Sequence, residues 1–221
     1  MKALIFDLDG TLIDSVYPHA LAWQETLHGI DMIVPAWEIH RYIGISGRLL
    51  VRALGRARGR SFEDGEIEQL ETQHDALFRE YAPLQVPLPG AAELLKFLRE
   101  AGVSYGIATT GKRKEIQAAL DALQVGNDCV VVDGSSTDKA KPEPDLFTAC
   151  RRRLKVESSN CLVVGDAVWD VHAARRAGIL AVGVLTGGVG EQELSNAGAM
   201  RVYRDAGEVL RRIDELGLEL H

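Results

Sequence analysis

Short apolar runs alternate with longer segments of helical hydrophobic spacing along most of the chain. The runs Lys2–Phe6 and Asn160–Gly165 are largely apolar and too short for helices, which is typical of parallel strands buried on both faces. After Lys112, apolar residues instead recur every three or four positions, as expected for a surface helix. This alternation predicts an α/β fold with a doubly wound parallel sheet. We expect strands near 3–7, 104–108, 129–132, 161–165, 180–184 and 201–203, and helices near 90–101, 112–123, 144–154, 168–177, 191–197 and 206–216.

The segment from about residue 15 to residue 86 interrupts this alternation. Its hydrophobic spacing predicts helices and no strand, and a proline-rich linker near 83–89 joins its end to the rest of the chain. We therefore expect a core domain of residues 1–14 and 88–221, with a helical domain of residues 15–87 inserted into it. The helices of the insertion are expected near 15–29, 35–43, 46–57 and 63–81.

Composition narrows the class of protein. A hydrophobic content of 46% over 221 residues is enough for a substantial core. The net charge of −7 argues against a nucleic-acid-binding protein, which usually presents a basic surface. The chain has no apolar run of the roughly twenty residues that span a bilayer. Three cysteines without Cys-x-x-Cys spacing, and a first strand with no leader before it, favour reduced thiols in a cytoplasmic protein. Whether it is a monomer or a dimer is left open.

The first expected strand ends at Asp7-Leu8-Asp9-Gly10-Thr11-Leu12. Because side chains alternate along an extended chain, Asp7 and Asp9 point to the same side. Two carboxylates so close raise each other's pKa unless a positive charge lies between them. A divalent cation would supply that charge. Gly10 lets the backbone turn or approach a ligand closely.

Three later strand ends also carry polar residues. Thr109-Thr110-Gly111 lies between a strand and a helix, where a hydroxyl either binds phosphate or caps the helix. Lys141-Pro142-Glu143-Pro144-Asp145 offers a lysine held extended by the proline after it, whereas the competing Lys139 lacks such a proline. Gly165-Asp166-Ala167-Val168-Trp169-Asp170 places two acids four apart, which would lie on one face if a helix started at Asp166. Each of these residues by itself could be a helix cap, or an acid placed at a helix start where the helix dipole favours it. These roles do not explain an acid pair, a hydroxyl, a lysine and a second acid pair in succession.

In this order the four segments resemble the four motifs of the haloacid dehalogenase superfamily in its phosphatase form. The subgroup that the chain resembles includes phosphoglycolate phosphatases and β-phosphoglucomutases. The resemblance implies a Rossmann-like core and a helical cap inserted after the first motif. The sequence departs from the pattern at Thr110, where many relatives have Asn.

The resemblance also implies a role for each motif residue. Asp7 would be the nucleophile that forms an aspartyl phosphate, and Asp9 the general acid and base. Mg²⁺ would be held by Asp7, the main-chain carbonyl of Asp9, and Asp166. Asp170 would order metal-bound water or hold Lys141. Thr109, Thr110 and Lys141 would bind phosphate oxygens.

Two residues of the inserted domain are further candidates for substrate contact. Arg48 lies in Gly44-Ile45-Ser46-Gly47-Arg48, a segment that relatives use to reach the substrate, and a solvated arginine is the alternative. His19 lies four residues before Trp23 on the first helix of the insertion, so the two face the same way. Structural packing is the alternative for His19. We expect the run Arg56, Arg58 and Arg60 to form a solvated loop.

We therefore expect a Mg²⁺-dependent phosphatase, a phosphoric monoester hydrolase, that acts on a small phosphorylated metabolite. The alternative is a sugar phosphomutase of the β-phosphoglucomutase type, whose first cap helix shows a similar His-x-x-Ala-Trp pattern. Gly165-Asp166-x-x-x-Asp170 fits the phosphatase branch better. A remote alternative is a non-catalytic binding protein on this fold, for which the loss of Asp7 or Asp9 would be the signature. Gly187–Gly190, after the fifth expected strand, is expected to be a plain turn, and a mobile loop near the site is the alternative.

Overall fold

The computed structural model describes residues 3–126, 129–137 and 139–218, and the chain divides into two compact units. The first unit comprises Met1–Asp14 and Val86–His221, and the second comprises Ser15–Gln85. None of the helices in the described part of the chain is both long and apolar enough to cross a membrane. All three cysteines are free thiols, with Cys150 and Cys161 buried.

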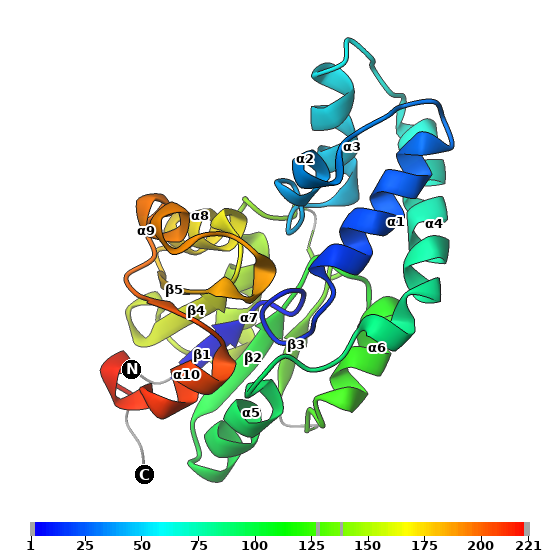
Figure 1. Ribbon diagram of the computed structural model, residues 1–221. Coiled ribbons are helices and arrows are strands. Elements are labelled where there is room, and N and C mark those ends of the chain that lie inside the picture. Colours follow the sequence, from blue (N-terminus) through cyan, green and yellow to red (C-terminus); the bar gives the residue numbers. More distant parts are fainter. Residues whose placement is uncertain (1–2, 127–128, 138, 219–221) are drawn as a thin grey trace. The chain divides into compact units, whose positions relative to one another are not determined.

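A parallel sheet forms the centre of the first unit (Figure 1). Its strands, in the order β3-β2-β1-β4-β5-β6, reverse direction of winding between β1 and β4. This order is that of a doubly wound nucleotide-binding fold, and the predicted α/β class is confirmed. The strands are β1 (Ala3–Phe6), β2 (Ser104–Ala108), β3 (Val130–Val132), β4 (Cys161–Gly165), β5 (Leu180–Val184) and β6 (Val202–Tyr203).

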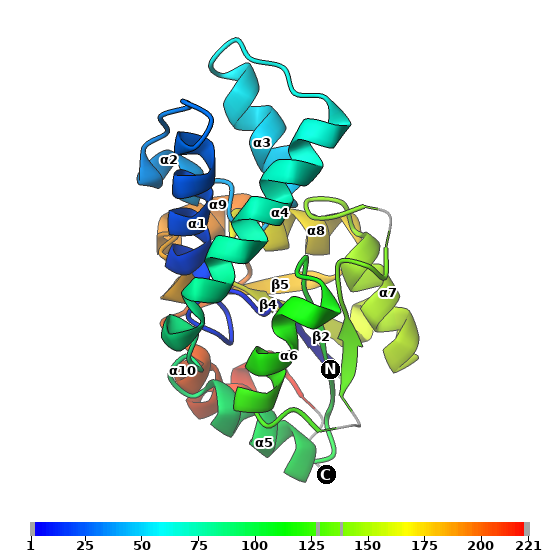
Figure 2. The same cartoon turned by 90° about the vertical axis from the view of Figure 1, so that its right-hand side faces the viewer.

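Side chains on the two faces of the sheet pack into two separate hydrophobic cores. Leu4 and Phe6 of β1 pack on one face, and Ala3 and Ile5 pack on the other, all without measurable exposure. Burial on both faces explains why β1 is apolar throughout. The first face is covered by α5 (Ala91–Glu100), α6 (Arg113–Ala122) and α10 (Ala206–Arg211). The second is covered by α7 (Asp145–Leu154), α8 (Val168–Arg176) and α9 (Glu191–Ala197) (Figure 2).

The second unit is helical. It contains α1 (Val16–His28), α2 (Ala36–His40), α3 (Gly47–Arg56), α4 (Asp64–Glu80) and the short 3-10 helix η1 (Ala82–Leu84), and residues 15–85 contain no strand. Trp23, Leu27, Leu50 and Ile67 are buried in a core of its own. The expected solvated loop of basic residues is wrong for Arg58, because its guanidinium forms a two-pronged ion pair with Glu38, at 2.7 and 2.9 Å.

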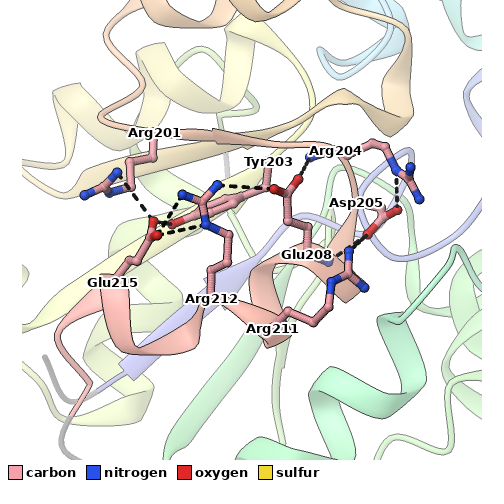
Figure 3. Close-up of polar contacts among 8 residues, drawn as sticks. All are labelled: Arg201, Tyr203, Arg204, Asp205, Glu208, Arg211, Arg212 and Glu215. Carbon is pink, nitrogen blue, oxygen red and sulfur yellow. Dashed lines mark hydrogen bonds and ion pairs between the residues drawn. The ribbon is translucent and has the colours of Figure 1, made fainter.

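The last expected helix, 206–216, is interrupted in the structure. α10 ends at Arg211, and the 3-10 helix η4 (Ile213–Leu216) follows Arg212, whose backbone leaves the helical region at φ −119°. The apolar face survives the break, because Val209, Ile213 and Leu216 are all buried in the same core. At this break the Arg212 guanidinium forms ion pairs with Glu208 at 3.3 Å and with Glu215 at 2.8 Å (Figure 3).

Asp205 belongs to the same polar network and begins α10. Its side chain accepts a hydrogen bond from the Glu208 main-chain N–H at 2.8 Å, and Arg204 lies 3.1 Å away (Figure 3). Partial burial acts to raise the pKa of Asp205, but the Glu208 N–H and Arg204 outweigh it and hold that pKa below its usual range. A carboxyl with a lowered pKa stabilises the folded state above its unfolded pKa, and this contribution is lost as the pH falls through the folded pKa.

Asp205→Asn should therefore change how the free energy of unfolding depends on pH in the acid range. Because Asn caps helices about as well as Asp, the variant keeps the cap and loses the charge. We expect about 1 kcal/mol or less of destabilisation near neutral pH, which is lost as the pH falls through the lowered pKa of Asp205 and the wild-type carboxyl is also protonated. Urea unfolding near neutral pH and at a series of acidic pH values measures this difference. A penalty that does not shrink as the pH falls would contradict a charge contribution from Asp205.

Candidate active site

The polar residues expected at the strand ends lie at the carboxyl edge of the sheet. Asp7 follows β1, Thr109 follows β2 and Asp166 follows β4, and these three strands are neighbours (Figure 1). The Asp7 N–H donates to the Val164 carbonyl at 2.9 Å, which continues the pairing of β1 with β4 beyond the last strand residue. The edge between β1 and β4 is the point where the winding reverses, the usual place for a ligand in this fold.

Lys141 is buried between two carboxylates. Its Nζ lies 2.5 Å from Oδ1 of Asp7 and 2.8 Å from Oδ1 of Asp170, and the residue has no solvent exposure. Burial acts to lower the pKa of Lys141, but Asp170 and Asp7 outweigh burial and hold that pKa well above its usual range. Lys141 is therefore a permanent cation. The competing Lys139 is exposed.

Asp170 reaches this cluster from the first turn of α8. The helix begins at Val168, in agreement with the helix expected near 168–177, and Asp166 lies in the preceding loop. Oδ2 of Asp170 accepts a hydrogen bond from the Ala167 N–H at 3.0 Å, which satisfies a donor at the helix start. Oδ1 then faces Lys141. A side chain at Gly165 would collide with Asp170, since an added Cβ would lie 2.5 Å from its Cβ.

Asp166 is held by a residue that the sequence did not single out. Thr11 Oγ1 donates to Oδ1 of Asp166 at 2.6 Å, and both side chains are buried. Thr11 belongs to the Asp7–Leu12 segment, and its position two residues after Asp9 was the one sequence feature that could have indicated a role in the site. Burial, together with Asp170 and Asp7, raises the pKa of Asp166 well above its usual range.

Asp7, Asp166 and Asp170 form one buried acid cluster. Each offers a carboxylate oxygen, and these oxygens lie within 4.8 Å of one another. Burial raises the pKa of Asp7 to about 7, Lys141 opposes this rise, and Asp170 and Asp9 add to it. One ammonium does not balance three ionised carboxylates, so the cluster favours either protonation of an acid or a further positive charge. A hard divalent cation with oxygen ligands fits this donor set.

Thr109 and Asp9 meet beside the cluster. The Thr109 hydroxyl donates to Oδ2 of Asp9 at 3.3 Å and accepts from the Gly111 N–H at 3.0 Å. Asp9 is half-buried, unlike Asp7. Thr110 lies in the same loop and is half-buried. The Gly134 N–H donates to the carbonyl of the next residue, Gly111, at 2.9 Å, and this hydrogen bond joins the loop to the one after β3.

The two remaining candidates lie in the helical unit and have partners there. Arg48 pairs with Asp64 at 2.5 Å and with Glu68 at 3.5 Å. His19 Nδ1 lies 3.1 Å from Nε2 of the buried His74, and the His19 ring stacks on Phe78. These contacts hold both side chains in defined positions within that unit.

Comparison with known proteins agrees with this geometry. The model of the haloacid dehalogenase-like hydrolase family matches residues 1–178. The β-phosphoglucomutase of Bacillus subtilis is 30% identical over 100% of this chain and 93% of its own. The phosphoglycolate phosphatase of Rhodospirillum rubrum is 31% identical over 92% of this chain and 87% of its own. The crystal structure of a hydrolase from Pseudomonas syringae has a TM-score of 0.94 at 39% identity, covering 98% of this chain and 99% of that one.

The comparisons confirm the resemblance found in the four motifs. Phosphatase names recur among the relatives, consistent with the predicted phosphoric monoester hydrolase. The family match extends from Asp7 beyond Asp170, so it spans every strand end that contributes to the acid cluster. The chain belongs to the haloacid dehalogenase-like hydrolases.

Proposed function

We propose that the protein is a Mg²⁺-dependent phosphatase that hydrolyses a small phosphorylated metabolite through an aspartyl phosphate on Asp7. The observation that carries this proposal is the buried acid cluster with Lys141 inside it, beside the Thr109 hydroxyl. Asp7, Asp166 and the main-chain carbonyl of Asp9 would hold the cation. When bound, Mg²⁺ supplies positive charge to the cluster and to the phosphate oxygens.

In the first step an Asp7 carboxylate oxygen attacks phosphorus, and the bond from phosphorus to the leaving alcohol oxygen breaks. Lys141 lies 2.5 Å from Asp7, where it orients the carboxylate and offsets the negative charge gathered on phosphate. Asp9 donates its proton to the leaving oxygen. Its half-buried position at 3.3 Å from Thr109 leaves its carboxyl accessible to an incoming group.

In the second step Asp9 accepts a proton from water while the water oxygen attacks phosphorus. The bond from phosphorus to Asp7 breaks, which releases inorganic phosphate and restores both carboxyl groups to their starting states. Thr109 and Thr110 would bind the remaining phosphate oxygens at the start of α6. Asp170 holds Lys141 at 2.8 Å through both steps.

The helical unit, residues 15–85, would serve as the cap that selects the substrate and limits access of water. Arg48 and His19 are the residues proposed for substrate contact. The relatives named for phosphoglycolate favour a small phosphorylated acid as the substrate class. The cytoplasmic location expected from the sequence is part of the same proposal.

A sugar phosphomutase is the second candidate, because the relative from Bacillus subtilis named β-phosphoglucomutase matches the whole chain. A mutase returns the phosphoryl group from Asp7 to a sugar instead of to water. It therefore requires a sugar bisphosphate for turnover and releases little inorganic phosphate.

Release of phosphate from a panel of small phosphate monoesters, with and without Mg²⁺, tests the proposal. We expect rapid release from at least one member, lost when a chelator removes Mg²⁺ and restored when Mg²⁺ is added back. β-Glucose 1-phosphate with a trace of the bisphosphate serves as the parallel assay. Conversion to the 6-phosphate without release of phosphate would replace the phosphatase by the mutase.

A further inference from the structure

The turn after β5 contacts the cluster, although the sequence favoured a plain turn there over a loop near the site. This turn is a short 3-10 helix, η3 (Leu185–Gly187). A Cβ added to Gly187 would lie 1.8 Å from Oδ2 of Asp166, much closer than any side chain permits. Gly187 is not among the glycines with positive φ, so its backbone would accept an L-residue. What excludes a side chain at Gly187 is therefore the Asp166 carboxylate.

The Asp166 carboxylate is consequently confined on both sides. Oδ1 accepts the hydrogen bond from Thr11 at 2.6 Å, while Oδ2 faces the main chain of Gly187. A rotation that breaks the Thr11 bond would have to move Oδ2 against a backbone that cannot yield as a flexible side chain would. The two contacts together set the direction in which Asp166 presents its oxygens.

The neighbouring Thr186 holds a second part of the site. Its hydroxyl donates to the Gly10 carbonyl at 2.5 Å, although the two residues lie 176 positions apart. Gly10 has φ +77° and donates its own N–H to the Ile13 carbonyl at 2.8 Å. The backbone that follows Asp9 is thus held at both peptide groups of Gly10.

We propose that Thr186 and Gly187 are positioning residues for the cation, acting through Asp166 and through the Asp9–Gly10 backbone. This inference rests on the proposed function, in which Asp166 and the Asp9 carbonyl are ligands. Supporting groups of this kind orient ligands without touching the metal, and their loss typically weakens metal binding by about 10- to 100-fold.

Gly187→Ala tests the inference, and Gly190→Ala is its matched control. Gly190 lies three residues later with φ −73°, and nothing lies within 4 Å of a Cβ added there. We expect Gly187→Ala to raise the Mg²⁺ concentration for half-maximal thermal stabilisation by at least about 10-fold, without substrate present. The Mg²⁺ concentration for half-maximal activity should rise in parallel, and Gly190→Ala should match the wild type in both.

Thr186→Val and Thr186→Ser keep the inference testable if Gly187→Ala does not fold. The valine variant removes the hydroxyl at nearly constant volume and should weaken Mg²⁺ binding, whereas serine should restore it. Unchanged Mg²⁺ titrations in Gly187→Ala and Thr186→Val would overturn the inference while leaving the proposed function intact. A wild-type protein that shows neither stabilisation by Mg²⁺ nor Mg²⁺-dependent activity would overturn the proposed metal requirement itself, and this inference with it.

Discussion

Asp7→Asn is expected to lower phosphate release by about 10⁴-fold or more while leaving the protein folded. An amide is a poor nucleophile toward phosphorus, so the covalent step has no replacement in the cluster. Losing a covalent nucleophile commonly costs this much, and the remaining rate reflects binding and electrostatic stabilisation alone. Incubation with substrate followed by mass spectrometry should show a phosphorylated wild-type intermediate and none in the variant.

The direction of the Asp7 pKa shift indicates that this variant will not simply unfold. Burial raises that pKa to about 7, so the folded state favours the protonated carboxyl. For such a group the stabilisation is present at low pH and is lost as the pH rises through about 7. Asn is neutral at every pH and therefore escapes this loss. Without Mg²⁺, Asp7→Asn should be at least as stable as the wild type above about pH 8.

Two comparison variants separate the roles of neighbouring carboxylates. Asp9→Asn should lose about 10²- to 10⁴-fold, the usual contribution of general acid–base catalysis, and should keep the nucleophile. Asp14→Asn changes an exposed acid in the same segment and should behave as wild type. Wild-type turnover by Asp7→Asn, with its amide shown to be intact, would exclude the aspartyl phosphate.

The sequence was sufficient to predict the strand ends of the site, because β1, β2 and β4 are largely apolar and each is followed by a polar residue. Parallel strands bring their carboxyl ends to one edge, so Asp7, Thr109 and Asp166 had to approach one another once the fold class was known. Pro142 distinguished Lys141 from Lys139, and the structure buries the first and exposes the second.

Contacts between distant segments were beyond the sequence. The hydrogen bonds from Thr11 to Asp166 and from Thr186 to Gly10 join residues 155 and 176 positions apart, and no local pattern encodes them. The start of α8 at Val168 agrees with the helix expected near 168–177. The spacing of the two acids did not show that Asp166 lies in the loop before it, because two acids four apart suit a helix as well as a loop followed by a helix. The hydrophobic spacing predicted one continuous helix over 206–216 and missed the break at Arg212, because a 3-10 turn can keep the same residues in the core.

Lys141→Met is expected to destabilise the protein by about 3–5 kcal/mol, the cost of removing one partner from a buried ion pair. Methionine fills much of the same space but leaves Asp7 and Asp170 without their counter-charge. Since Lys141 opposes the rise in the Asp7 pKa, its loss should raise that pKa further. The penalty should therefore be larger at about pH 8 than at about pH 5.5, where Asp7 binds a proton. Urea unfolding without Mg²⁺ at the two pH values measures it.

Three controls make the assignment of this loss specific. Lys139→Met removes an exposed lysine two residues away and should change stability by less than about 0.5 kcal/mol. Lys141→Met combined with Asp170→Asn removes one charge of each sign, so it should recover part of the loss, as expected for residues in direct contact. Mg²⁺ should also stabilise Lys141→Met more than it stabilises the wild type, because the cation then replaces the positive charge that the three carboxylates have lost. A Lys141→Met variant as stable as Lys139→Met at both pH values would show that the cluster does not depend on this ammonium, and the role of Lys141 in balancing charge on Asp7 would have to be abandoned.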